Sequence, residues 1–150
     1  MTARLAPDRS QRGQALVEFS LAVIVFLVLL MGVVDLGRGI YMYNGVSQAA
    51  REIARVTSVH PGADPTVKAT WSAQMASVVS TQENLIPNLG DPTIQCFTID
   101  GVTAATCTTG NYVQVQVIAP YKAVTPLLGL FGTWNMKSVS LVQIEAPLGN

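Results

Sequence analysis

The sequence has little charge and no excess of either sign. Only 12% of its 150 residues are charged, and nine Lys and Arg residues balance nine Asp and Glu residues. Proteins that bind nucleic acids usually carry a basic patch or stripe, and this chain offers neither that nor an acidic tail. We therefore expect no nucleic-acid partner.

Residues that carry out chemistry are equally scarce. His60 is the only histidine, and Cys96 and Cys107 are the only cysteines, so one chain cannot supply a closed zinc site. The sequence shows no nucleophile with a histidine partner, no phosphate-binding glycine loop and no distinctive carboxylate pair. Gly37 and Gly39 fall inside an expected helix and do not form a dinucleotide-binding motif. We expect no enzymatic activity, metal, cofactor or small-molecule substrate.

One long apolar run is present near the N-terminus. Residues 15–34 are mostly apolar, and Glu18 is the only charged residue among them. Twenty helical residues, at about 1.5 Å each, match the hydrocarbon thickness of a bilayer. A secretory signal peptide is the competing interpretation, because Arg4, Arg9 and Arg12 precede the run. The run is longer than a signal core and no small-x-small site follows it, so we favour a membrane-spanning helix.

The charges that flank this run predict its orientation. Three arginines and Asp8 precede it, whereas Asp35 and Arg38 follow it. Because cytoplasmic flanks carry the excess of Lys and Arg, residues 1–13 are expected to be a cytosolic leader, without regular structure over residues 1–12. Residues from about 36 onward are expected outside the membrane.

The helical pattern continues beyond the run. Apolar residues at intervals of three and four predict one helix over residues 14–58, ended by His60-Pro61-Gly62. The expected stripe consists of Val34, Ile40, Tyr41, Val46, Ala49, Ala50, Ile53 and Ala54, and Tyr43 is also expected to pack. Four glycines weaken this helix: Gly32, Gly37, Gly39 and Gly45. They form either a flexible, packable neck or positions that tertiary contacts hold in place.

Residues 59–150 predict an exported α+β domain. Asp64 as N-cap and Pro65 as the first helical residue start a second amphipathic helix, which Pro87 ends. Its expected stripe is Val67, Trp71, Met75, Val78, Val79, Leu85 and Ile86. Stretches 93–99, 112–119 and 136–145 predict three strands of a small antiparallel sheet beneath this helix, and Pro120 is expected to close the second.

Cys96 and Cys107 both fall in the part expected outside the membrane. In an oxidising compartment they are expected to form a disulfide, with free thiols or a metal pair as the alternatives. If the cysteines lie directly opposite each other, residues 100–103 form a four-residue turn. A two-residue Asp-Gly turn would instead place Cys96 opposite Ala105.

A second apolar run covers residues 125–132. It is too short to span a bilayer and too rich in glycine to predict a helix. We expect it to fill the core between strands. The alternative is an exposed contact for a neighbouring subunit.

Glu18 is a residue that a simple membrane anchor does not need. A carboxylate inside an apolar run costs free energy, so it either reaches back to the interface or has a partner. If a peptidase cuts after Gly13, Gln14 becomes the N-terminus and Glu18 the fifth residue. Glu18 could then neutralise the freed ammonium of its own helix or of a neighbouring helix.

A second pattern lies near the end of the expected long helix. Three alanines give a thin face on which another element can lie close, and Arg51 and Arg55 share the opposite edge. Glu52 can pair with Arg55, and both arginines complement the helix dipole. The arginines either have this structural role or bind a partner. The segment reads Gln48-Ala49-Ala50-Arg51-Glu52-Ile53-Ala54-Arg55.

Together these patterns resemble a known family over residues 12–56. The matching residues are Arg12-Gly13, Ala15-Leu16-Val17-Glu18-Phe19, Asp35-Leu36-Gly37-Arg38 and the segment from Gln48 to Arg55. They resemble the TadE-like family of the tight adherence (Flp, type IVb-like) pilus system. Many relatives carry a proline in the apolar run, whereas this chain has none between Pro7 and Pro61, which predicts a straighter helix.

The resemblance implies a minor pilin or pseudopilin with a pilin-like fold, held in a bacterial cytoplasmic membrane or incorporated in a pilus. Its partners would be the membrane, other pilins or pseudopilins and the assembly machinery, with a prepilin peptidase for some members. Gly13 and Gln14 would be the processing site, and Glu18 and Phe19 assembly residues. The alternative is a permanently anchored envelope scaffold or adhesin that is not processed.

Overall fold

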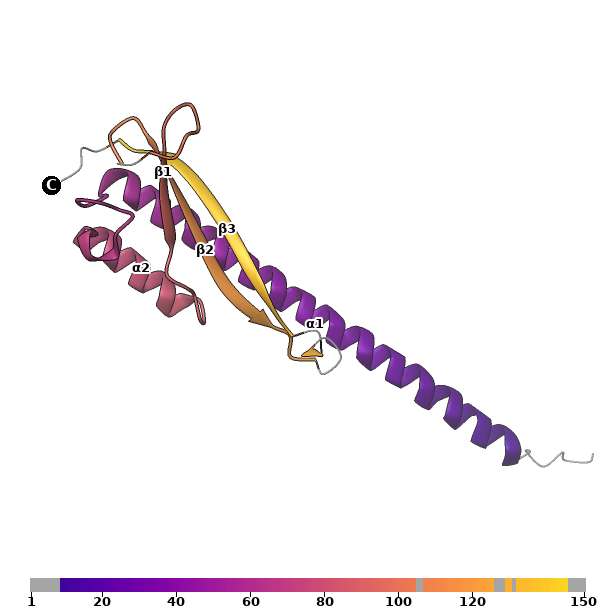
Figure 1. The fold of residues 1–150 in the computed structure, drawn as a ribbon. Coiled ribbons are helices and arrows are strands. Elements are labelled where there is room, and N and C mark those ends of the chain that lie inside the picture. Colours follow the sequence, from indigo (N-terminus) through magenta and orange to yellow (C-terminus); the bar gives the residue numbers. More distant parts are fainter. Residues whose placement is uncertain (1–8, 105–106, 126–128, 131, 146–150) are drawn as a thin grey trace, which may run out of the picture. The chain divides into compact units, whose positions relative to one another are not determined.

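The computed structural model describes residues 9–104, 107–125, 129–130 and 132–145. The elements are α1 (Arg9–Val59), the 3-10 helix η1 (Lys68–Thr70), α2 (Ala73–Leu85), β1 (Thr93–Phe97), β2 (Tyr112–Lys122) and β3 (Thr133–Gln143) (Figure 1). The fold is α+β, as predicted. The chain divides into two compact units, Met1–Gly37 and Arg38–Asn150.

In the first unit the helix is longer than predicted. It begins at Arg9 rather than at residue 14, so the irregular lead-in expected over residues 9–12 is wrong. No proline or run of glycines follows Pro7 in this stretch, and the helix therefore extends ahead of Gly13. Residues 1–8, the rest of the expected leader, lie outside the described residues.

The apolar run is exposed along almost its whole length. Phe19, Leu21, Phe26 and Leu29 each expose more than half of their surface. The helix is long and apolar enough to cross a membrane, and none of its most apolar window is buried. The structure therefore contains one candidate membrane-spanning helix within its described residues.

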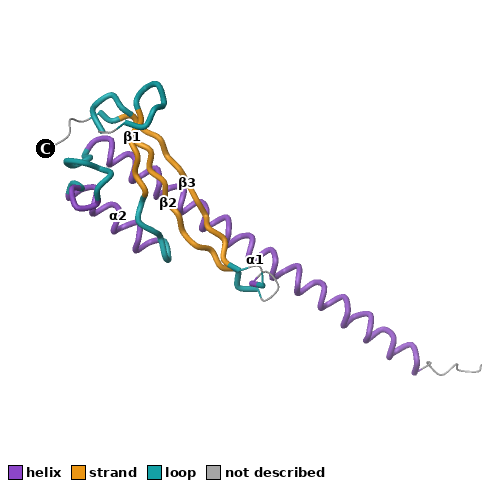
Figure 2. The backbone as a smooth tube through the Cα atoms, in the orientation of Figure 1, coloured by secondary structure: helices purple, strands orange, loops and turns teal. Residues whose placement is uncertain are grey.

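The second unit has one hydrophobic core that α1, α2 and the sheet share. Figure 2 shows the α1 helix running along the sheet and α2 beside it. Odd-numbered residues of β2 face the core and even-numbered residues face outward, as the alternation predicted. The main core residues are Val46, Ala49, Ala50, Ile53 and Ala54 from α1, Met75 and Val79 from α2, and Ile94, Val113, Val115, Val117 and Ala119 from the sheet.

The buried stripe of α1 is partly as predicted. Five of the predicted residues are buried, and Val34, Ile40 and Tyr41 are exposed. The buried ones are Val46, Ala49, Ala50, Ile53 and Ala54. Tyr41 and Tyr43 expose 82% and 51% of their surface, so their predicted packing role is wrong. Counting back four residues from Val46 leads to Met42, which packs against the core, whereas the tyrosines on either side of it are not among the residues packed there.

The second helix begins later than predicted. Its N-cap is Ser72, whose Oγ accepts a hydrogen bond from the Met75 backbone N–H at 3.1 Å. Asp64 does accept from the Thr66 backbone N–H at 2.9 Å, but it caps a single turn. Trp71 then leaves the helical path, and its Nε1 donates to the Pro65 carbonyl at 2.8 Å.

This late start changes the predicted stripe of α2. Met75, Val79 and Ile86 are buried, and Val78 packs against the core. Val67 and Leu85 are exposed, so their predicted core positions are wrong. Val67 lies before the helix, where the 3.6-residue period does not apply.

The sheet is antiparallel, as predicted, and its strand order is β1-β2-β3. Pro120 does not close β2, which continues to Lys122. The Ile118 carbonyl accepts from the Gly90 N–H, so the backbone polar groups of Ile118 face away from β3. These groups alternate sides along a strand, and Pro120, two residues further, therefore faces the same way as Ile118. Strand β1 begins at Thr93, opposite Gln116, and its ladder with β2 therefore does not reach Pro120 and does not need the N–H that Pro120 lacks.

The predicted disulfide between Cys96 and Cys107 is present, with a Cα–Cα distance of 5.4 Å. Both predicted turns are wrong. Phe97 pairs with Thr103, and the Ala104 N–H donates to the Cys96 carbonyl at 2.8 Å. The turn has three central residues and ends on Gly101 at φ 77°, a positive angle that glycine adopts without strain.

Half of the second apolar run, residues 126–128 and 131, lies outside the described residues. Leu130 is 83% exposed, so the core-filling prediction is wrong for that residue.

The helix glycines differ from one another. A Cβ added at Gly39 or Gly45 would lie 3.8 Å from Tyr121 or 3.6 Å from Ile86, which agrees with glycines held by tertiary neighbours.

We predict that removing the disulfide destabilises the second unit. Replacing both cysteines by alanine frees a loop with a sequence separation of 11. The expected loss is about 2–3 kcal/mol of unfolding free energy, because the unfolded chain gains entropy. Urea denaturation of the full chain in detergent measures it. An unchanged midpoint for the double variant would contradict this role.

We predict opposite effects for alanine at two glycines. Gly45→Ala is expected to stabilise the chain by about 1 kcal/mol, because the new Cβ meets Ile86 at ordinary contact distance and alanine favours the helix. Gly62→Ala should destabilise it, because Gly62 has φ +79° and its Cβ would lie 2.2 Å from the Thr70 carbonyl oxygen. Thermal melting compares both with the wild type, and equal shifts would contradict the packing described.

Candidate functional site

The first candidate site is the predicted processing and assembly segment, Gly13 to Phe19, in the first unit. It lies inside α1, and all its side chains are exposed. No heavy atom lies within 4 Å of a Cβ added at Gly13, so the bond between Gly13 and Gln14 is open on that side. Because this bond is helical, a peptidase would have to unwind α1 locally to reach it.

Glu18 has a partner within this segment. The Gln14 side chain donates from Nε2 to Glu18 Oε1 at 3.3 Å, across one helical turn. Phe19 beside it exposes 67% of its surface and points to no core within the chain. This contact joins two side chains, whereas the sequence predicted a pairing of Glu18 with a freed ammonium at Gln14, which stays a prediction.

The second candidate site is the pair of arginines near the end of α1. Arg55 and Glu52 form a two-pronged ion pair, with Nη2–Oε1 at 2.6 Å and Nε–Oε2 at 3.1 Å. Arg51 instead donates to Ser47, from Nη2 to the hydroxyl at 2.8 Å and from Nε to the carbonyl at 3.2 Å. The predicted pair between Glu52 and Arg55 is therefore confirmed, and both guanidinium groups face solvent.

This ion pair changes the acidity of both partners. The hydrogen bond from Arg55 lowers the pKa of the Glu52 carboxyl, and slight burial opposes it. The same hydrogen bond raises the pKa of Arg55. Because these side chains are largely exposed, the pair contributes little to stability.

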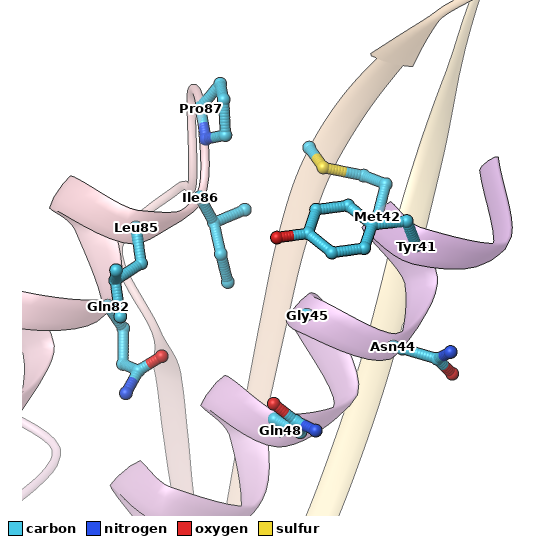
Figure 3. A pocket seen from close by; sticks show the side chains of 9 residues that line it. All are labelled: Tyr41, Met42, Asn44, Gly45, Gln48, Gln82, Leu85, Ile86 and Pro87. Carbon is cyan, nitrogen blue, oxygen red and sulfur yellow. The ribbon is translucent and has the colours of Figure 1, made fainter. Parts of the chain in front are cut away.

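A groove between α1 and α2 was not predicted. Figure 3 shows Tyr41 and Met42 on α1 facing Ile86 and Pro87 at the end of α2. The cavity measures about 390 Å³, and its remaining lining residues are mostly polar amides: Asn44, Gln48 and Gln82, with Gly45 and Leu85. A second hollow of about 460 Å³ joins it at Gln48, Gln82 and Leu85 and reaches Arg51 and Arg55. The groove depends on the placement of α2 beside α1, a long-range contact with no short-range sequence signal.

Within the described residues, no three His, Cys, Asp or Glu side chains are placed to hold a metal ion. The 390 Å³ cavity has no carboxylate or imidazole among its lining residues. The 460 Å³ hollow is lined by one carboxylate, that of Glu52, which is paired with Arg55.

Comparison with known proteins finds a family similarity in the N-terminal region. Residues 13–55 match the family model TadE, described as TadE-like protein, so this part of the chain is similar to that family. The TadE-like family is associated with the tight adherence pilus system and is structural rather than enzymatic. No curated protein and no solved structure matches the chain. The match includes Gly13, Glu18 and both arginines, and it ends four residues before α1 does.

We predict that Arg55 controls the titration of Glu52. In the wild type the Glu52 pKa lies below the ordinary value of a glutamate. The ion pair therefore stabilises the folded chain at pH values above that ordinary value, and this stabilisation is lost as the pH falls through the lowered pKa. Arg55→Gln should return the Glu52 pKa toward the ordinary value. Carbon-detected NMR titration measures it, with Arg51→Gln as the matched control that leaves Glu52 unchanged. A common shift in both variants would contradict the assigned pairing.

Proposed function

We propose that this chain is a TadE-like minor pilin or pseudopilin that primes or enters a tight adherence pilus. The observation that supports it most is a coincidence of two features. The TadE-like segment, residues 13–55, covers the helix that is long and apolar enough to span a membrane. The candidate membrane anchor and the match to a family of pilus components thus fall on the same helix, α1.

The N-terminal half of α1 would lie in the bacterial cytoplasmic membrane, with the N-terminus in the cytoplasm and the unit from Arg38 onward outside. The excess of arginine before the run supports this orientation. The disulfide between Cys96 and Cys107 supports export, because such bonds persist in oxidising compartments.

Assembly would exchange one apolar environment for another. Side chains such as Phe19 and Leu21, which are exposed in the single chain, can be covered by lipid or by the helices of neighbouring subunits. Lipid tails and leucine side chains are similarly apolar, so the exchange has no large hydrophobic cost, and specific polar contacts decide the partner.

Glu18 would supply that polar contact after a cut between Gly13 and Gln14. The freed ammonium at Gln14 is a cation at the positive end of the helix dipole, where it is unfavourable alone. A carboxylate one turn away, or on an adjacent subunit, would neutralise it inside the bundle.

We predict that Glu18→Ala leaves the chain in the membrane but reduces pilus number. The expected reduction is about tenfold or more, because an unpaired charge in an apolar bundle costs about 3–5 kcal/mol. Membrane fractionation and electron microscopy measure the two quantities. Ser20→Ala is the matched control, since Ser20 lies in the same stretch and bonds only within its own helix, to the Leu16 carbonyl. Normal pilus number with Glu18→Ala would disprove the assembly role of Glu18.

A further inference from the structure

Gln14 has a chemical property that the proposed function does not use. A cut after Gly13 would make it the first residue, so its reactivity in the cell rests on that part of the proposed function. An N-terminal glutamine can cyclise. Its α-amine nitrogen attacks its own side-chain carbon Cδ, the N–Cδ bond forms, and the Cδ–Nε2 bond breaks. One proton moves from the amine to the departing nitrogen, ammonia leaves, and a five-membered lactam (pyroglutamate) remains.

In the uncut chain this reaction cannot start. The Gln14 nitrogen is then a peptide nitrogen within α1, which begins at Arg9. An amide nitrogen has its lone pair delocalised into the carbonyl and is not a nucleophile. Cleavage would therefore create the reactive amine and the reactive carboxamide on one residue at the same moment.

The structure shows what opposes the ring closure. The Gln14 carboxamide donates from Nε2 to Glu18 Oε1 at 3.3 Å, which directs it along α1 toward the next turn. Ring closure requires the same carboxamide to fold back onto the Gln14 nitrogen, so this hydrogen bond must first break. Both side chains are exposed, so water competes for the bond and the closure is slowed rather than blocked.

Glu18 also acts through its charge. The freed amine would lie about 6 Å from residue 18 along the helix axis. A carboxylate at that distance favours the ammonium form, which has no lone pair and cannot attack Cδ. In water this attraction alone corresponds to about a threefold lower population of the reactive amine.

We propose that Gln14 is a latent self-modifying site, which closes to pyroglutamate once it is the N-terminus, and that Glu18 slows this closure. The lactam carries no charge, so it can no longer pair with Glu18 of its own or an adjacent helix. Its ring resembles that of proline, which the first turn of a helix accepts. Closure would thus leave the helix intact and remove the ammonium, and the amine would be available to a neighbouring subunit only before closure.

The test releases Gln14 without the native peptidase. The four residues before Gln14 are replaced by a factor Xa recognition sequence, and the otherwise full chain is cut in detergent. Intact-mass spectrometry then follows the loss of one ammonia with time, for the wild type, Glu18→Ala and Glu18→Gln. Ser20→Ala is the matched control, and Gln14→Ala, which has no side-chain amide to lose as ammonia, shows the background. Circular dichroism checks that each variant keeps its helix.

The wild type should lose ammonia slowly, and Glu18→Ala should lose it about threefold faster or more. Glu18→Gln should be intermediate, because its amide can still accept from Gln14 but has no charge, and Ser20→Ala should follow the wild type. Equal rates in the wild type and both Glu18 variants, or no loss above the Gln14→Ala background in any chain, would overturn the proposal. Because the added protease makes the cut, these outcomes do not depend on whether a cell processes the native chain.

Discussion

The structure depends on one constraint, which is that a single helix has to satisfy two environments. The N-terminal half of α1 presents apolar side chains that nothing among the described residues covers, and its most apolar window has no buried residue. The C-terminal half carries small residues that are completely buried in a protein core. Apolar surface of this extent is stable only when lipid or other apolar side chains cover it. The family match falls on the same helix and includes parts of both halves.

The architecture of the second unit follows from the buried half of α1. Ala49, Ala50 and Ala54 are small enough for α2 and the sheet to approach the helix closely, and larger residues such as Ile53 and Met75 fill the spaces between them. The strand β1 has only five residues and lies at the edge of the sheet, so it gains little from its own ladder. The disulfide ties this short strand to the segment that follows its turn. The unit is therefore built around the helix rather than attached to it.

Much of this arrangement was predictable from local patterns. The long helix, the alternation along β2 and the pairing of Glu52 with Arg55 depend on residues close in sequence, and the structure confirms all three. The errors arose where the same short sequence pattern is compatible with two local backbone structures. Asp64 and Pro65 resemble a helix start, but the backbone is extended at Trp71, whose side chain donates to the Pro65 carbonyl, and α2 begins only after it. Pro120 resembles a strand end, and it is tolerated because the ladder between β1 and β2 does not reach it.

Other features required contacts that no short-range pattern contains. The exposure of Tyr41 follows from which side of α1 the sheet covers, and the groove beside it exists because α2 runs back along α1. The turn after β1 ends on Gly101, where a positive φ selects three central residues over the two alternatives that simple counting suggested. For the candidate site the position was predictable, since Gln14 and Glu18 are one helical turn apart, but the hydrogen bond between their side chains was not.

The central claim is that α1 is an anchor that also becomes an assembly surface, and that the bond between Gly13 and Gln14 separates these two states. The most direct test is the intact mass of the chain extracted from its native membrane and from sheared pili. The account predicts a chain that begins at Gln14, with or without the loss of one ammonia. A chain that still carries residues 1–13 in both fractions would contradict it and would indicate a permanently anchored protein.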